Sequence, residues 1–160
     1  MTDLPVSLRP ARPEDEAFLF QVYASTRAEE MALVDWTREQ LGAFLRMQFD
    51  MQRRSYLMQS PAATYEVVVR DEVPVGRLIV ERAEECIQLI DIALLPEYRG
   101  AGIGSTLIRD LQAEAARNGK VVRLHVEVSN PALSLYERLG FVRLNSDGLY
   151  WSMEWTPTAS

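Results

Sequence analysis

Three glycines fall within five residues, at Gly100, Gly102 and Gly104, between an apolar segment and a helix-like pattern. Glycine costs a helix about 1 kcal/mol relative to alanine, so its concentration at a helix start calls for a reason. The first turn of a helix has unpaired N–H groups, and residues without a Cβ atom let an anion approach them. The stretch therefore predicts a strand–turn–helix unit that binds phosphate, with a tight turn that binds no ligand as the alternative.

The spacing of these glycines excludes two common phosphate-binding motifs. The dinucleotide fingerprint requires G-x-G-x-x-G, and here the third glycine comes one residue early. A P-loop requires a lysine after its last glycine, and none follows Gly104 in this stretch. The glycines therefore indicate another class of anion site.

Length, charge and cysteine content narrow the class of protein. A chain of 160 residues predicts one domain over residues 1–160, and its net charge of −6 argues against a nucleic-acid partner. The single cysteine, Cys86, cannot form an internal disulfide, so we expect a reducing compartment and a buried, inert thiol. No basic-then-apolar leader and no apolar run of about 18 residues occurs, so we expect a cytoplasmic protein without a membrane segment.

Hydrophobic periodicity predicts a mixed α/β chain in the order β-α-α-β-β-β-α-β-α-β-β. Thr37 with Gln40 is a capping-box pattern, and Asn130 followed by Pro131 is typical of a helix start. Helices are expected to begin near residues 13, 37 and 131, and the helix after the glycines to end near 117. Strands are expected near 6–9, 64–70, 75–82, 86–95, 120–128, 141–145 and 149–155.

Several segments resemble the GNAT superfamily of N-acetyltransferases. Residues 99–104, RGAGIG, match its R/Q-x-x-G-x-G/A motif. The segments LRPARPED, IDIALLPEYRGAGIGSTLI and NPALSLYERLGF resemble its first strand, its central strand with loop and helix, and its last helix. The resemblance implies an α/β fold with a single mixed, mostly antiparallel sheet of about seven strands and about four helices, splayed at the acetyl-CoA site. It implies acetyl-CoA as cosubstrate and no metal.

The resemblance also implies which residues bind acetyl-CoA. Backbone groups of Ile92, Ala93 and Leu94 would pair with the pantetheine arm like an added strand. Asn130 belongs to the same set. It precedes Tyr136 by six residues where the family commonly has seven, so either the loop is one residue shorter or Ser129 takes the place of the asparagine. The pyrophosphate would be held by the loop and the first turn of the helix: Arg99, Gly100, Ala101, Gly102, Ile103, Gly104 and Ser105.

When an amine attacks a thioester, the enzyme must remove a proton from the amine, stabilise the oxyanion of the tetrahedral intermediate and protonate the leaving thiolate. Tyr136 lies where the family has the tyrosine that faces the CoA sulfur, and a phenol is protonated at neutral pH, so it is the candidate acid. Packing through its ring is the alternative. The resemblance places His125 where some members carry a glutamate, and alternation puts Glu127 on the same strand face, so both are candidate bases, against the alternative of no dedicated base. Asp91 is a third candidate, and Gln88 stands where some members have a glutamate.

The acceptor is expected to be a primary amine of a small molecule or a peptide. The family's first two helices usually contact the acceptor, and here they carry Arg27, Glu29, Glu30, Asp35 and Trp36, although solvated surface charge explains these residues equally. A second hypothesis is an acyl-CoA-binding sensor or interaction module with little turnover, and a third is O-acetyl or longer acyl transfer. The apolar terminal strand LYWSMEW is expected to pair across a homodimer. Packing of this strand in the core is the alternative explanation of its apolar residues.

Overall fold

The structure is a computed structural model that describes residues 6–158. It divides into two compact units. The first holds the described residues up to Leu78 together with Ile92–Tyr98, and the second holds Ile79–Asp91 and the described residues from Arg99 onward. Two strands therefore contribute residues to both units. That residues 1–160 form one domain stays a prediction.

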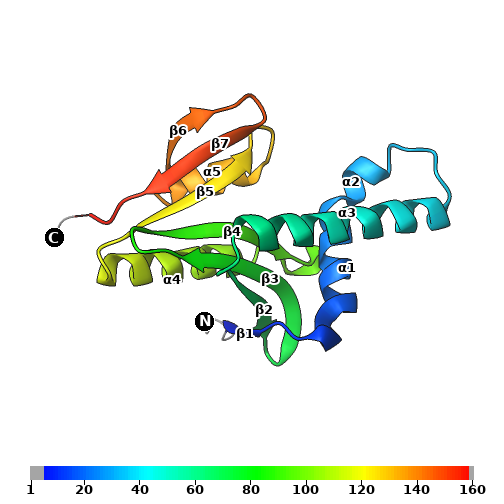
Figure 1. Cartoon of the computed structure of the whole chain (residues 1–160), viewed down its shortest axis with the longest axis horizontal. Coiled ribbons are helices and arrows are strands. Elements are labelled where there is room, and N and C mark those ends of the chain that lie inside the picture. The colour runs from blue at the N-terminus through cyan, green and yellow to red at the C-terminus, as the bar shows by residue number, and fades with distance from the viewer. Residues whose placement is uncertain (1–5, 159–160) are drawn as a thin grey trace. The chain divides into compact units, whose positions relative to one another are not determined.

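The strands form a seven-stranded sheet in the order β1-β2-β3-β4-β5-β7-β6 (Figure 1). β4 and β5 pair in parallel, whereas β1 with β2, β5 with β7 and β6 with β7 pair antiparallel, so the predicted mixed, mostly antiparallel sheet is confirmed. The strands are β1 (Val6–Pro10), β2 (Thr64–Arg70), β3 (Val73–Arg82), β4 (Cys86–Leu94), β5 (Val121–Glu127), β6 (Val142–Ser146) and β7 (Tyr150–Trp155). The helices are α1 (Glu16–Thr26), α2 (Ala28–Met31), α3 (Arg38–Gln59), α4 (Ile103–Arg117) and α5 (Ala132–Arg138), with 3-10 turns η1 (Pro13–Asp15) and η2 (Pro96–Tyr98).

In the first unit, α1 packs against α3 through aromatic rings. Phe49 is fully buried, and its ring lies 5.6 Å from that of Phe20 and 5.7 Å from that of Tyr23. Arg27 donates hydrogen bonds of 2.9 Å to the Tyr23 hydroxyl and of 2.9 Å to Gln48 Oε1, which joins the end of α1 to the middle of α3. Aromatic packing and this polar bridge together fix the two helices.

The predicted start of α3 is confirmed. Thr37 Oγ1 accepts from the Gln40 N–H at 3.1 Å, and Gln40 Oε1 accepts from the Thr37 N–H at 2.9 Å. Both partners of the capping box are thus satisfied. The single helical turn α2 was not predicted, because four residues carry too little periodicity to show a helix.

The hairpin between β2 and β3 is tighter than the sequence suggests. Asp71 and Glu72 have φ values of 53° and 65°, as the two central residues of a type I′ turn require. β3 therefore begins at Val73, two residues before the expected start. The sequence lacks the Asn-Gly or Asp-Gly pair that usually marks this turn, so its signal was weak.

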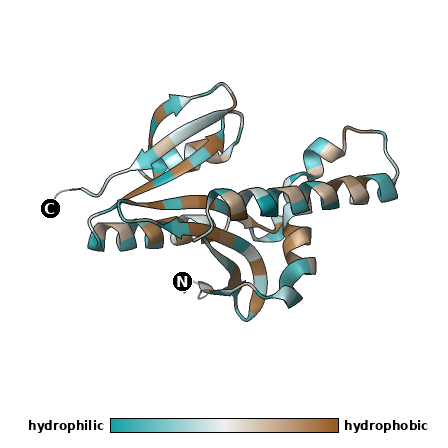
Figure 2. Ribbon diagram, viewed as in Figure 1, coloured by the Kyte–Doolittle hydropathy of each residue, from teal (hydrophilic) through white to brown (hydrophobic). Residues whose placement is uncertain are grey.

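In the second unit, β5 alternates between two environments. Val122, Leu124 and Val126 are buried, whereas Arg123, His125 and Glu127 are exposed, as the sequence predicted. Helices α4 and α5 contact β5, and since one face of the strand is exposed they cover the other. Hydrophobic and hydrophilic residues both line α4, as expected of an amphipathic helix (Figure 2).

Two expectations about the second unit need correction. β7 pairs with β5 along one edge and with β6 along the other, so it has no free edge through which to pair across a dimer. Cys86, the first residue of β4, is half-buried and not buried. Within residues 6–158, no helix combines the length and the apolar character that crossing a bilayer demands.

Candidate functional site

The glycine-rich turn leads directly into α4. Gly100 and Gly102 have φ values of 78° and 83°, in the left-handed region that glycine enters without strain. Gly102 is also the N-cap of α4, and its carbonyl accepts from the Thr106 N–H at 3.0 Å. The shape of the turn therefore explains two of the three glycines without any ligand.

Gly104 has no such explanation. It lies in the first turn of α4, and its φ is outside the left-handed region. A Cβ atom built on it meets nothing within 4 Å in the part of the chain that the structure describes. Neither backbone conformation nor packing requires a glycine there, and a glycine destabilises the helix by about 1 kcal/mol relative to alanine. The bare backbone at Gly104 is thus available to a ligand.

The N-terminus of α4 is electrostatically suited to an anion. Its N-cap is a glycine with no side chain to satisfy the helix N–H groups, and its first turn carries no acidic residue. The N–H groups of Ile103, Gly104 and Ser105 precede the first residue that can bond within the helix. A 15-residue helix adds the positive end of its dipole at this point. This end of α4 can bind a phosphate group.

The parallel pairing of β4 with β5 ends early. It runs from Cys86 opposite Val121 to Leu89 opposite Leu124, and among the described residues it goes no further. β5 nevertheless continues to Glu127, still paired with β7. His125 therefore lies just beyond the last pair of this ladder.

The end of β4 belongs to the first unit and is held tightly there. Ala93 is 8% exposed and packs in a small core with Val22 and Leu95. The Leu95 N–H donates to the Val75 carbonyl at 2.9 Å. A Cβ atom on Gly76 of β3 would lie 2.3 Å from the Ala93 carbonyl oxygen, so only glycine allows this approach. Sequence reasoning missed Gly76, although a lone glycine inside a strand was the available signal.

Tyr136 is held inside the second unit by α5. It is 8% exposed, and its ring packs on Phe141 with the ring centres 5.9 Å apart at 64°. Burial, with a smaller contribution from the Asp91 carboxylate, raises the pKa of Tyr136 to about 12. The phenol is therefore protonated at any physiological pH and can donate a proton. The predicted packing role and the predicted acid role are both compatible with this placement.

His125 and Glu127 lie on the opposite face of β5 from the one that α4 and α5 cover. Their cross-strand neighbours on β7 are Ser152 and Tyr150. Tyr136 and the two candidate bases are thus on different sides of the same strand.

Asn130 has a structural contact of its own. Its Oδ1 accepts from the Ala132 N–H at 2.9 Å, which caps α5. The helix begins at Ala132, one residue later than Pro131, where the sequence placed its start. This capping is the firmest role that the geometry gives Asn130.

The residues proposed to contact an acceptor are divided by the structure. Arg27 donates hydrogen bonds to Tyr23 and Gln48 and forms an ion pair of 3.0 Å with Glu30. The Trp36 ring packs on Phe44 at 5.2 Å. These contacts give Arg27 and Trp36 structural roles, whereas Glu29 and Asp35 are exposed.

An uncapped, glycine-lined helix N-terminus that follows a strand of a mixed α/β sheet is typical of phosphate-binding sites. Residues 14–141 match the model of the acetyltransferase (GNAT) family, and the chain belongs to this family. The predicted family and fold are therefore confirmed.

Individual relatives agree with this assignment. A ribosomal protein bS18-alanine N-acetyltransferase of Haemophilus influenzae is 35% identical over 68 residues, covering 42% of this chain and 47% of that protein. A glucosamine 6-phosphate N-acetyltransferase of Trypanosoma brucei brucei is 41% identical over 51 residues, covering 32% of this chain and 34% of that protein. The chain spans about half the length, or less, of the curated relatives that it matches.

Among solved structures, the PaiA N-acetyltransferase of Thermoplasma acidophilum, in complex with coenzyme A, superposes with a TM-score of 0.72. The match covers 96% of this chain and 100% of that one at 20% identity, so it shows a shared fold.

Proposed function

We propose that the chain transfers an acetyl group from acetyl-CoA, the cosubstrate of this family, to a primary amine that attacks the thioester directly. The observation that carries the proposal is the uncapped N-terminus of α4, whose first turn holds Gly104, a glycine that neither the backbone nor the packing needs. A pyrophosphate on the N–H groups from Gly100 to Ser105 gives it a purpose, because a Cβ atom there would stand where the phosphate must approach. Arg99 lies beside this anion.

The remaining cofactor contacts follow the family pattern. Backbone groups of Ile92, Ala93 and Leu94 bind the pantetheine arm. The rigid placement of Ala93 against Gly76 supports this role, since a preorganised strand end loses little entropy on binding. Asn130 supports the site through the cap of α5.

The reaction needs a base on the amine side and an acid on the sulfur side. As the N–C bond forms and the C–S bond breaks, the amine proton passes to His125 or Glu127, directly or through water, and the Tyr136 hydroxyl protonates the thiolate. His125 and Glu127 lie on the exposed face of β5, opposite the face covered by α5, which carries Tyr136, and this placement supports the assignment. Gln88 cannot accept this proton, so no base is expected from that position.

The acceptor is proposed as the amine of a peptide or a small molecule. The relatives named above act on an alanine of a ribosomal protein and on an amino sugar phosphate, which are different kinds of amine. Exposed Glu29 and Asp35 favour a cationic acceptor.

The test is incubation of the protein with acetyl-CoA and an amine panel, followed by free-thiol release and acceptor mass. Acetylated product with stoichiometric thiol is expected. Tight acetyl-CoA binding without thiol release on any amine would favour the sensor alternative. Gly104→Val is expected to weaken acetyl-CoA binding by more than about tenfold. Unchanged affinity in this variant would remove the pyrophosphate assignment.

A matched control distinguishes blocked approach of the phosphate from a general effect of replacing a helical glycine by valine. Gly42 also lies inside a helix with open space around it, so Gly42→Val carries the same loss of glycine without touching the loop. It should bind acetyl-CoA like the parent.

A further inference from the structure

The outer face of α3 carries an exposed row of methionines. Met47, Met51 and Met58 are 51%, 54% and 83% exposed, and Leu57 beside them is 55% exposed. We call these four residues the methionine stripe. On the other side of the same helix, Phe49 is fully buried. A helix with apolar residues on both faces covers its own core with one and is available for contact with the other.

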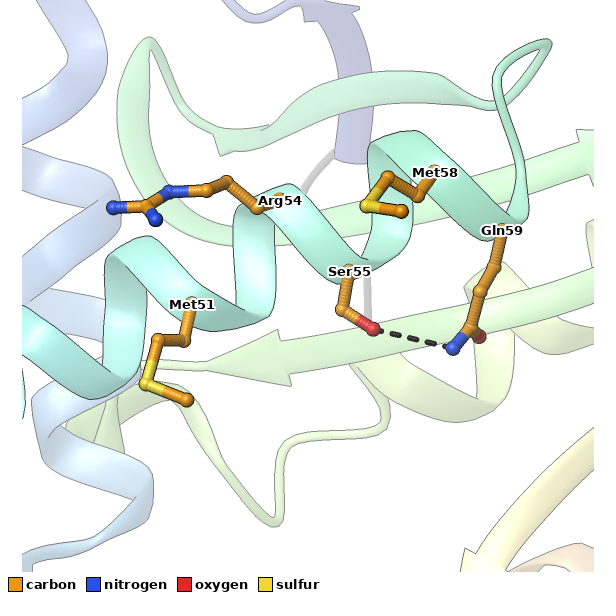
Figure 3. Close-up of a pocket in the computed structure, with 5 residues that line it drawn as sticks. All are labelled: Met51, Arg54, Ser55, Met58 and Gln59. Atoms are coloured by element: carbon orange, nitrogen blue, oxygen red, sulfur yellow. Dashed lines mark hydrogen bonds between the residues drawn. The ribbon is translucent and has the colours of Figure 1, made fainter.

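The stripe borders a groove of the kind that helices use to pack. A depression of about 340 Å³ is lined by Met51, Arg54, Ser55, Met58 and Gln59, all from α3 (Figure 3). Residues 51, 55 and 59 form one i+4 row, and residues 54 and 58 form the next. Two such rows are ridges with a groove between them, into which a ridge of another helix fits. The groove contains none of the predicted site residues.

Charges beside the stripe are self-complementary. Asp50 and Arg54 lie one turn apart in the i+4 row next to that of Met51. Asp50 reaches only Arg46, at 3.5 Å, and Arg54 has neither a hydrogen bond nor an ion pair within residues 6–158. Consider two copies of α3 packed antiparallel and related by a twofold axis that crosses the helices at the height of residue 52. Asp50 of each copy then lies level with Arg54 of the other. The same register sets Met47 level with Leu57.

We propose that the outer face of α3 is a self-association surface, on which a second copy of this chain docks antiparallel through the methionine stripe with reciprocal Asp50–Arg54 pairs. A twofold interface must be complementary to itself, and this face has apolar residues at both ends and both signs of charge at the centre. An anionic membrane or a nucleic acid would select a rim of one sign, which α3 lacks. Methionine suits such contacts because its side chain adapts to the opposing surface.

Sedimentation velocity of the full chain tests the proposal. A species of twice the 18.2 kDa chain mass is expected at micromolar concentration. Met51→Glu should raise the dimer dissociation constant at least about tenfold, because it buries a charge at the centre of the contact. Leu33→Glu is the control, since Leu33 is 88% exposed and lies outside α3. It should leave the dimer unchanged.

Charge reversal tests the register. Asp50→Arg and Arg54→Asp should each weaken the dimer, and the double variant should restore it, because the reciprocal pairs are re-formed with opposite polarity. Both side chains are on the surface, and circular dichroism checks the fold of each variant. Met58→Glu repeats the test if Met51→Glu unfolds. A monomer at about 100 µM, a dimer that resists both glutamate variants, or a double variant that stays as weak as the singles would each overturn the proposal. Binding to anionic vesicles in place of self-association would overturn it too.

Discussion

Gly76 offers the sharpest test of how the end of β4 is held. An alanine Cβ atom at this position would lie 2.3 Å from the Ala93 carbonyl oxygen and 2.7 Å from Leu94 Cδ2. Ordinary contacts begin at 3.4 Å, so β3 and the end of β4 must separate by about 1 Å. Ala93 is buried and Leu94 adjoins it, so neither can yield freely. Overpacking of this kind costs about 1–3 kcal/mol, which lowers Tm by about 2–12 °C in a chain of this size.

The same displacement should damage catalysis. Ala93 and Leu94 are proposed to hold the pantetheine arm, and an error of about 1 Å in a positioning group can cost about a hundredfold in rate. Thermal unfolding and kcat/KM for acetyl-CoA are measured side by side for Gly76→Ala and for Gly42→Ala. Gly42 has nothing within 4 Å in the described structure, so its variant should gain about 0.5–1 kcal/mol of stability and keep its activity. A Gly76→Ala protein with the parent's Tm and kinetics would refute the close approach of β3 to β4.

Three further changes probe separate features. Tyr136→Phe keeps the ring on Phe141 and removes the hydroxyl, so kcat should fall about ten- to a thousandfold with little change in acetyl-CoA affinity; a variant within about twofold of the parent retires the acid role. Because burial raises the pKa of Tyr136 to about 12, the parent's pH–rate profile should show no tyrosine limb below about pH 11. Glu72→Gly should add about 0.5–1 kcal/mol to the free energy of unfolding, since φ is 65° there; a loss on denaturant titration would contradict the turn type. Hydrogen bonding to Arg9 lowers the pKa of Asp15 to about 2, so its contribution of about 1 kcal/mol is present above about pH 5 and lost as the pH falls from about 4 to 2. Asp15→Asn should flatten the pH dependence of stability in that window, and an unchanged acid limb would show that the ion pair does not contribute.

Local patterns were enough for most of the fold. Alternation predicted that His125 and Glu127 share one face of β5, because strand side chains point to opposite faces in turn, and the structure exposes both. The Thr37–Gln40 capping box placed the start of α3, since all its partners lie within four residues. The family resemblance rested on motifs, and the match over residues 14–141 confirmed it.

The sequence by itself determined that a glycine-rich turn opens a helix, and it named Tyr136, His125 and Glu127 as candidates. Their arrangement depended on contacts between residues far apart in the chain. Burial and the Asp91 carboxylate set the pKa of Tyr136, and the β4–β5 ladder ends at Leu89 opposite Leu124, which leaves His125 beyond its last pair. The need for glycine at Gly76 came from the Ala93 carbonyl 17 residues away. Local sequence patterns cannot predict such features, because each depends on which distant atoms the folded chain brings close to a residue. Only the tertiary structure determines these contacts.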